Sequence, residues 1–259
     1  KEYKRGEYFT FEANENYYGG KPSIQNVTLR IIESTDTAKV ALQKGEVDAA
    51  VVLPSDIEDL DDTQISVYPY TENRIGYLGL NTHSDALQDV KVRQAVLYAL
   101  NKDELNQAAY LDEDYYATPY SFLPPNNPYV TKDVEKYETN AEKAKELLQE
   151  AGVTDLSLNL AFNSTDPAQT IQATLIQQQL QQAGITVTLE GGDGTAIFTE
   201  LKKPDSTKYN LFLGGYIMGN DPDLYGSLFE TGGSANYFQS NSETIDNLFA
   251  QAAVELDTD

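Results

Sequence analysis

The stretch 209–229, YNLFLGGYIMGNDPDLYGSLF, predicts a buried strand that opens into a polar, aromatic loop. Residues 210–213 form an extended apolar run, which is typical of a core strand. We expect the strand to stop at Gly214 and Gly215, because glycine allows a turn or the close approach of a ligand or a second chain. Asp-Pro at 221–222 is a turn signal. Such a strand end is where an α/β protein would hold a small ligand.

The same stretch has a second interpretation, a surface loop followed by a helix that Asp221 or Asp223 caps. Under the ligand-binding interpretation, the candidate contacts are Tyr216 and Met218, which offer large adaptable surfaces, and Asn220 and Asp221, which offer polar ends. The residues alone leave both interpretations open.

Composition limits the class of protein. The chain has 259 residues, of which 40% are hydrophobic, so it can form one large or two ordinary domains with a sizeable core. Its net charge of −23 argues against nucleic acid as a partner, because phosphates are bound by Lys and Arg. The same charge argues against an anionic membrane surface. Mutual repulsion would keep such a protein dispersed, and we expect a monomer.

Few residues offer chemistry. The chain has no Cys and one His, which excludes disulfides, the usual zinc sites and a Ser-His or Cys-His nucleophile. His83 lies in NTHSD, a polar turn, and we expect it to be solvated. The pairs Asp61/Asp62 and Asp221/Asp223 could serve acid–base work or bind a hard cation, although a solvated acidic surface is the preferred interpretation. The sequence therefore favours binding over catalysis, with no cofactor and no metal.

The first part of the chain has a β-α-β pattern, which favours an α/β fold. Strands are expected at 7–13, 27–32 and 47–53, with a short helix over 38–46 that Ser34, Thr35 or Asp36 caps and Gly45 ends. Residues 65–81 predict two extended segments, and we place a crossing between domains near 70–75. Further on, Asp89 is expected to cap a helix with an apolar stripe, and another helix is capped near Ser242.

Two later stretches, 141–162 and 171–191, repeat one supersecondary unit: a helix, then Ala-Gly, then an alternating strand. A capping box of Thr139 and Glu142 is expected to begin the first helix. Gly152 and Gly184 are expected to end the two helices in the left-handed conformation. The unit occurs only twice, so it does not predict a solenoid.

Five segments together resemble the peptide/nickel-type solute-binding proteins that feed ABC importers. They occur in the family's order, across almost the whole chain, at 4–32, 41–50, 77–105, 138–152 and 214–229. Examples are YYGGKPS within the first segment, GEVD within the second, and YLGLN followed by DVKVRQAVLYAL within the third. We therefore add Tyr77 and Asn81 to the candidate ligand contacts.

The resemblance implies a two-lobed α/β receptor of the periplasmic-binding-protein type, with mixed sheets flanked by helices, whose ligand is enclosed when a hinge closes. Residues 1–72 would belong to an incomplete first lobe and residues 73–259 to most of the second, so we expect a fragment of a longer protein. The implied function is to bind oligopeptides in an interlobe cleft and deliver them to the membrane permease. The implied setting is extracellular, either lipid-anchored on a Gram-positive cell or periplasmic.

One departure from the family pattern concerns the ligand. Peptide-binding relatives often have a tryptophan followed three residues later by an aspartate that holds the peptide's free amine. Here Tyr216 takes the aromatic place and Gly219 the place of the aspartate, while Asp221 could substitute or only stabilise the turn. This departure keeps open the same fold with a sugar or a nickel chelate as ligand. A carboxylate-dependent hydrolase and a regulatory or adhesive module are the remaining alternatives.

Overall fold

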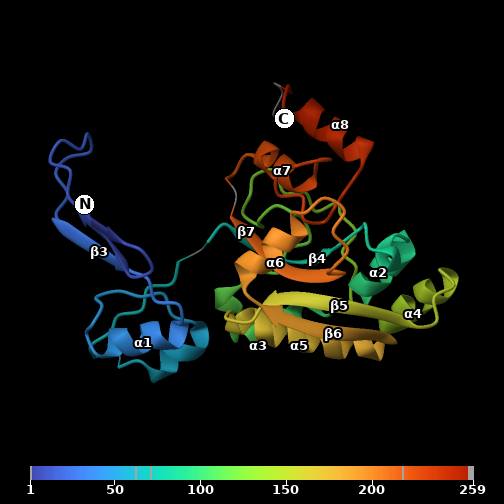
Figure 1. The fold of residues 1–259 in the computed structure, drawn as a ribbon, viewed down its shortest axis with the longest axis horizontal. Helices are drawn as coiled ribbons and strands as arrows, with labels where there is room; N and C mark the ends of the chain where they lie inside the picture. Colours follow the sequence, from blue (N-terminus) through green and yellow to red (C-terminus); the bar gives the residue numbers. More distant parts are fainter. Residues whose placement is uncertain (1, 62, 71, 218, 256–259) are drawn as a thin grey trace. The chain divides into compact units, whose positions relative to one another are not determined.

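The computed structural model describes residues 2–61, 63–70, 72–217 and 219–255, and the chain divides into two compact units, Lys1–Tyr68 and Pro69–Asp259. Figure 1 shows the elements of both units. Unit 1 contains β1 (Glu2–Lys4), β2 (Tyr8–Glu12), β3 (Asn26–Arg30), α1 (Thr35–Gln43) and the 3-10 helix η1 (Pro54–Asp59). Unit 2 begins with β4 (Arg74–Leu80), η2 (Asp85–Leu87), α2 (Val90–Tyr98), α3 (Lys102–Tyr110), η3 (Glu113–Tyr115) and α4 (Ala141–Glu150). It continues with β5 (Leu156–Asn163), α5 (Pro167–Gln182), β6 (Ile185–Gly192), α6 (Gly194–Leu201), β7 (Leu211–Ile217), η4 (Pro222–Tyr225), α7 (Gly226–Phe229) and α8 (Glu243–Ala252).

Unit 1 is built on an antiparallel sheet in the order β1-β2-β3. Ser34 caps α1 as expected, accepting a hydrogen bond from the Thr37 backbone N–H. The strand expected at 47–53 is wrong, because these residues pair with no other segment that the structure describes and lead into η1. Apolar β-formers become a strand only where a neighbouring strand completes the ladder.

Unit 2 is built on a four-stranded sheet in the order β4-β7-β5-β6. β5 runs parallel to both β6 and β7, whereas β4 runs antiparallel to β7. Leu160 and Ala161 are neighbours in β5 and point to opposite faces of the sheet, and both are fully buried. Leu160 belongs to the core under α2, α4 and α5, and Ala161 to the core under α6. Helices therefore cover both faces of this sheet (Figure 1).

The repeated units of helix and strand are confirmed as α4 followed by β5 and α5 followed by β6. Gly152 and Gly184 end the two helices with φ of 72° and 86°, values that favour glycine. The expected capping box is wrong: Asn140 caps α4 by accepting a hydrogen bond from the Lys143 N–H. The hydroxyl of Thr139 is used elsewhere, because it donates to the Leu100 carbonyl.

The expected end of the central strand at its two glycines is wrong, since β7 continues through them to Ile217. Gly214 lies opposite Tyr77 of β4. A Cβ at position 214 would lie 2.6 Å from the Tyr77 ring and 2.9 Å from the ring of Phe198 on α6. The glycine therefore makes room for two rings inside the unit and does not end the strand.

In the part of the chain that the structure describes, no helix combines the length and hydropathy needed to cross a membrane.

Candidate ligand-binding site

The carboxyl ends of three parallel strands meet at one edge of the unit 2 sheet. These ends are Asn163 of β5, Gly192 of β6 and Ile217 of β7. β4 begins at the same edge, where Arg74 pairs with Ile217. Ligands of open α/β sheets bind outside the carboxyl ends of the strands. The stretch that contains most of the candidate contacts, 216–221, follows directly from this edge.

The last residues of β7 alternate between a buried and an exposed face. Tyr216 is buried beside its cross-strand partner Ile75. On the other face, Gly215 pairs with Gly76 and both are exposed, as is Ile217. A glycine pair carries no side chains, so the backbones of both strands are open to solvent at this point.

Packing does not require the glycine at position 76. A Cβ added there would meet no atom within 4 Å, and the φ angle lies outside the left-handed region. Gly215 is more restricted, because a Cβ there would lie 3.1 Å from Nε of Arg74. The Arg74 side chain therefore lies beside Gly215, at the exposed face of the strand end.

Tyr216 and Tyr77 form the aromatic floor behind this edge. Their ring centroids are 5.6 Å apart. The Tyr216 hydroxyl donates a hydrogen bond to the Phe122 carbonyl, which ties β7 to the loop that follows η3. Burial raises the pKa of both phenols above the usual value for tyrosine, so both are neutral at physiological pH.

Asn220 and Asp221 are exposed, and internal hydrogen bonds fix the backbone around them. The Asn73 amide donates to Oδ1 of Asn220 (3.0 Å), and the buried Asn127 amide donates to the Asn220 carbonyl (3.1 Å). Asp221 caps η4, because its Oδ1 accepts a hydrogen bond from the Asp223 N–H (3.0 Å). The interpretation of Asp221 as a cap is thus confirmed, and its carboxylate lies at the surface next to the strand end.

Asn81 has a different environment from the other candidates. It is fully buried; its amide donates to the Ser206 and Tyr209 carbonyls, and its Oδ1 accepts from the His83 N–H. These contacts anchor the turn after β4 inside unit 2. His83 itself is partly exposed, with Nδ1 3.2 Å from a carboxylate oxygen of Asp205. Met218, also a candidate, lies outside the described residues.

Sequence reasoning missed three features of this edge: Arg74, Gly76 and Tyr110 at the end of α3. The pKa of Tyr110 is raised, chiefly by burial, and the charge of the nearby Arg74 acts in the opposite direction. The paired glycines could be found only with the register of β4 against β7. Among the described residues, no group of three or more His, Cys, Asp or Glu side chains is arranged to hold a metal ion.

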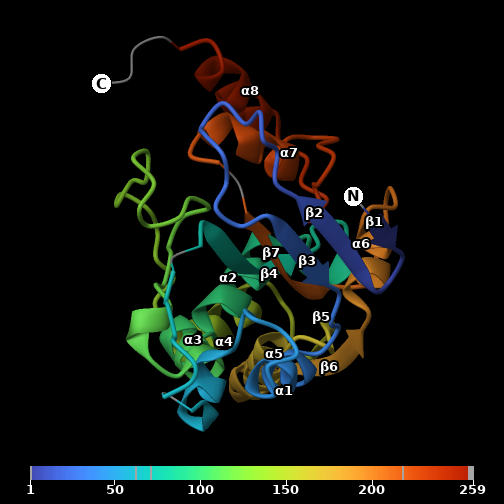
Figure 2. The ribbon, with the colours of Figure 1, turned by 90° about the vertical axis from the view of Figure 1, so that its left-hand side faces the viewer.

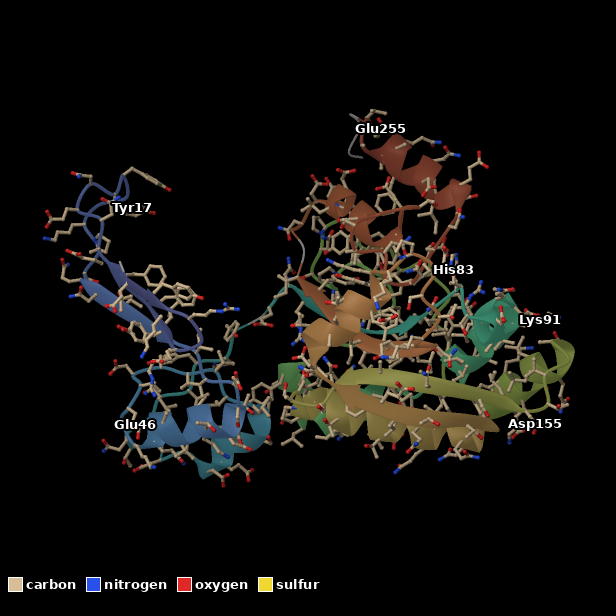
Figure 3. The ribbon with its side chains drawn as sticks, viewed as in Figure 1. Tyr17, Glu46, His83, Lys91, Asp155 and Glu255 are labelled. Atoms are coloured by element: carbon tan, nitrogen blue, oxygen red, sulfur yellow. The ribbon has the colours of Figure 1, made fainter. Side chains whose placement is uncertain are left out.

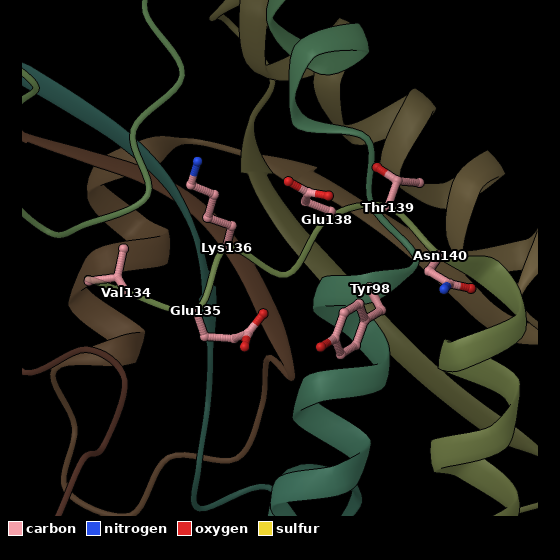
Figure 4. A pocket seen from close by; sticks show the side chains of 7 residues that line it. All are labelled: Tyr98, Val134, Glu135, Lys136, Glu138, Thr139 and Asn140. Atoms are coloured by element: carbon pink, nitrogen blue, oxygen red, sulfur yellow. The ribbon is translucent and has the colours of Figure 1, made fainter. Parts of the chain in front are cut away.

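A separate hollow of about 470 Å³ lies beside the segment between η3 and α4 (Figure 4). It is lined by Tyr98, Val134, Glu135, Lys136, Glu138, Thr139 and Asn140. Two of these side chains have structural roles, since Thr139 bonds to the Leu100 carbonyl and Asn140 caps α4. None of the candidate contacts lines this hollow, so we place the site at the carboxyl edge of the sheet.

Comparison with known proteins shows which family the chain belongs to. The model of the bacterial extracellular solute-binding proteins, family 5 middle region, matches residues 1–238. The chain belongs to this family. The resemblance inferred from the five sequence segments is therefore confirmed.

Named relatives differ in what they bind. The oligopeptide-binding protein AppA of Bacillus subtilis is 28% identical over 240 residues, which cover 87% of this chain and 44% of AppA. The nickel-binding periplasmic protein of Escherichia coli is 29% identical over 223 residues, which cover 76% of this chain and 41% of that protein. The crystal structure of the ABC transporter substrate binding protein CtaP from Listeria monocytogenes superimposes with a TM-score of 0.88 at 36% identity, covering 100% of this chain and 53% of CtaP.

These comparisons confirm the α/β, periplasmic-binding-protein-like fold class. The chain spans about half the length of the relatives that it matches.

Proposed function

We propose that the protein containing this chain is the solute-binding receptor of an ABC importer, that it binds oligopeptides between two lobes and that it delivers them to the membrane permease. The main observation in favour of a peptide ligand is the exposed Gly76–Gly215 pair at the carboxyl edge of the sheet. In the same proposal, residues 1–72 belong to the first lobe and 73–259 to the second.

An exposed strand backbone suits a peptide because main-chain hydrogen bonds do not depend on the peptide's sequence. The chain has glycine, and therefore no side chain, at the two positions where a peptide backbone would approach β4 and β7. Ile217, which is 66% exposed, offers an apolar contact beside this backbone, and Arg74 offers a cation. Tyr77 and Tyr216 support the strands from the buried face, and Asn81 anchors the turn after β4.

Asp221 is the proposed partner of the peptide's amine. Its carboxylate is at the surface and is already oriented by its hydrogen bond to the Asp223 N–H. Asn220 is held beside it by Asn73 and Asn127. An ammonium ion that loses water on lobe closure needs an anionic partner, and Asp221 supplies one where Gly219 cannot.

Mass spectrometry of the small molecules released by denaturing the purified full-length protein tests the ligand class. A ladder of peptides of similar length and mixed sequence would support the proposal. A single non-peptide mass would overturn the peptide part of it and leave the receptor part intact. That second candidate, a sugar or a metal chelate in the same fold, is favoured by one observation, the glycine at position 219.

Asp221→Asn tests the role of the carboxylate with little disturbance of the fold, because asparagine caps helices as well as aspartate does. In the full-length protein, affinity for a peptide with a free amino terminus is expected to fall roughly 30-fold, the equivalent of about 2 kcal/mol for a lost charge-assisted contact. Asp223→Asn is the matched control and is expected to bind normally. Equal affinities of the two variants for that peptide would remove Asp221 from the site.

The setting is also part of the proposal. We place the receptor outside the cytoplasm, on a lipid anchor in a Gram-positive cell or in a periplasm, as a monomer. The net charge of −23 supports the monomer through repulsion between copies. Fractionation of the native cells and light scattering of the purified full-length protein test the two statements.

A further inference from the structure

The guanidinium of Arg74 lies on the open backbone at the carboxyl edge of the unit 2 sheet. β4 and β7 run side by side there (Figure 2), and the register pairs Arg74 with Ile217 and Gly76 with Gly215. All four residues are exposed. A Cβ at position 215 would lie 3.1 Å from Nε and 3.3 Å from Nη2 of Arg74. The guanidinium therefore lies over Gly215, so a ligand that approaches the open backbone meets this cation.

No described residue neutralises Arg74. Its side chain forms no ion pair and no hydrogen bond within the described part of the chain. Two carboxylates of the same region are engaged elsewhere, because Glu72 accepts from the Tyr70 hydroxyl (3.0 Å) and Asp166 caps α5. The nearby Tyr110 phenol has a pKa raised chiefly by burial, so it is neutral at physiological pH. The guanidinium is therefore available to an anionic group of a ligand.

One hydrogen bond links Arg74 to Asp221, the carboxylate that we assign to the peptide's amine. The Asn73 amide donates to Oδ1 of Asn220 (3.0 Å), and these asparagines immediately precede Arg74 and Asp221. The path between the two charged residues consists of two Cα–Cα steps of ~3.8 Å, two short side chains and this hydrogen bond. A peptide whose amine is held at Asp221 therefore reaches Arg74 within its first few residues.

We propose that Arg74 makes the receptor select ligands that carry a carboxylate close to their free amine. The inference rests on the proposed function, because it takes a peptide held at Asp221 as the ligand. A guanidinium can bind a carboxylate through two parallel N–H···O bonds, a geometry that favours the carboxylate over a neutral amide. The carboxylate is either the carboxyl terminus of a very short peptide or an acidic side chain near the amino end of a longer one.

The charge of the chain gives this contact a second role. A net charge of −23 repels an anionic ligand, and 41 acidic residues stand against 18 Lys and Arg. A free guanidinium at the site offsets that repulsion over the distance that salt leaves unscreened, about 8–10 Å. The preference for a carboxylate is therefore expected to come from this one position and not from the surface as a whole.

Isothermal titration of the full-length protein, freed of bound solute, tests the inference. The probes are Ala-Glu-Ala-Ala-Ala, Ala-Gln-Ala-Ala-Ala and trialanine, each with a free and with an amidated carboxyl terminus. At least one carboxylate is expected to raise affinity roughly 10-fold over its neutral amide, within the range of a charge-assisted hydrogen bond. Preference for Glu over Gln assigns the contact to a side chain. Preference for the free terminus of trialanine assigns it to the carboxyl terminus.

Arg74→Gln is expected to abolish that preference and to leave the affinity for the neutral probes unchanged. Arg74→Lys is expected to restore part of it, because it keeps the charge and loses the paired geometry. Lys91→Gln is the matched control for the loss of one charge. Lys91 pairs with Glu150 (3.1 Å), and Figure 3 shows it at the end of unit 2 where β5 begins, away from the carboxyl edge.

The outcomes separate this inference from the proposed function. Probes that bind with the same affinity with and without the carboxylate would overturn the inference and leave the peptide receptor intact. A preference that survives in Arg74→Gln, or that Lys91→Gln removes equally, would overturn it in the same way. An Arg74→Gln variant that weakens charged and neutral probes alike would show a structural role only and would also overturn it. Failure of the unaltered protein to bind any of the probes would overturn both the peptide ligand and the inference.

Discussion

The two sheets of this chain are made from similar sequence patterns and differ in how much of each is buried. In unit 2, neighbouring residues of β5, Leu160 and Ala161, are both fully buried, because helices lie on both faces. In unit 1, Phe9 remains 39% exposed on one face, and Thr28 is exposed on the other. Alternation and β-propensity are therefore sufficient to form strands in both units, whereas a core requires a covering layer, which only unit 2 contains among the described residues.

The largest expected effect concerns the two units produced separately. Residues 69–259 are expected to unfold in one cooperative urea transition with a stability of about 5 kcal/mol or more, as is usual for a domain with a complete core. Residues 1–68 are expected to show no transition, because little of their apolar surface is buried. Far-UV circular dichroism across a urea series makes the measurement. A cooperative transition in residues 1–68 would contradict the conclusion that unit 1 has no complete core of its own.

A matched pair of phenylalanines gives the next largest effect. Phe212 of β7 is fully buried, with its ring centroid 5.6 Å from that of Phe238. Phe212→Ala is expected to destabilise unit 2 by about 3–5 kcal/mol, the usual cost of removing a buried ring. Phe9→Ala in residues 1–259 is expected to cost less than about 0.5 kcal/mol, as at an exposed position.

Urea midpoints of the two variants measure both losses of stability. Repeating the Phe9→Ala measurement in the full-length protein tests whether Phe9 is also exposed there. If Phe9 is buried in the full-length protein, Phe9→Ala is expected to cost about 2 kcal/mol or more there. A cost that stays near zero in both forms would mean that Phe9 is solvent-exposed in the full-length protein as well.

Helix ends could be predicted from sequence because their causes are local. Asp89 and Ser242 cap helices through the backbone N–H groups that follow them within three residues, and Gly152 ends α4 through its own φ. Strand ends could not be predicted in this way. β7 passes through Gly214 because Tyr77, distant in sequence, fills the space of its missing side chain. Residues 47–53 form no strand because they pair with no other described segment.

The residues of the candidate site also differ in whether their contacts are local in sequence. Asp221 could be identified as a cap because its acceptor role involves the next residue but one. Asn81 could not be separated from the exposed candidates, because its partners Ser206 and Tyr209 lie 125 and 128 residues later. The Gly76–Gly215 pair depends on the register of two strands and has no signature in either strand alone.

Alkaline pH is expected to weaken unit 2 through its buried phenols. Burial raises the pKa of Tyr77 and of Tyr216 in the folded state, whereas unfolded tyrosine titrates near pH ~10. A raised folded pKa means that the stabilisation is fully present below pH ~10 and is lost as the pH rises above it. Urea midpoints of residues 69–259 at about pH 8 and pH 11 measure the loss. The double variant Tyr77→Phe/Tyr216→Phe is expected to lose less, and an unchanged pH dependence would assign the effect to other groups.

The smallest effect compares one kind of hydrogen bond in the two environments. The Tyr216 hydroxyl donates to the Phe122 carbonyl at a partly buried position, and the Tyr8 hydroxyl donates to Oε1 of Glu2 (2.9 Å) at an exposed one. Tyr216→Phe is expected to cost about 1 kcal/mol, because the Phe122 carbonyl loses its partner away from water. Tyr8→Phe is expected to cost nothing measurable, since water replaces the lost contact. If Tyr8→Phe in the full-length protein costs as much as Tyr216→Phe, the face of the unit 1 sheet that carries Tyr8 must be covered there.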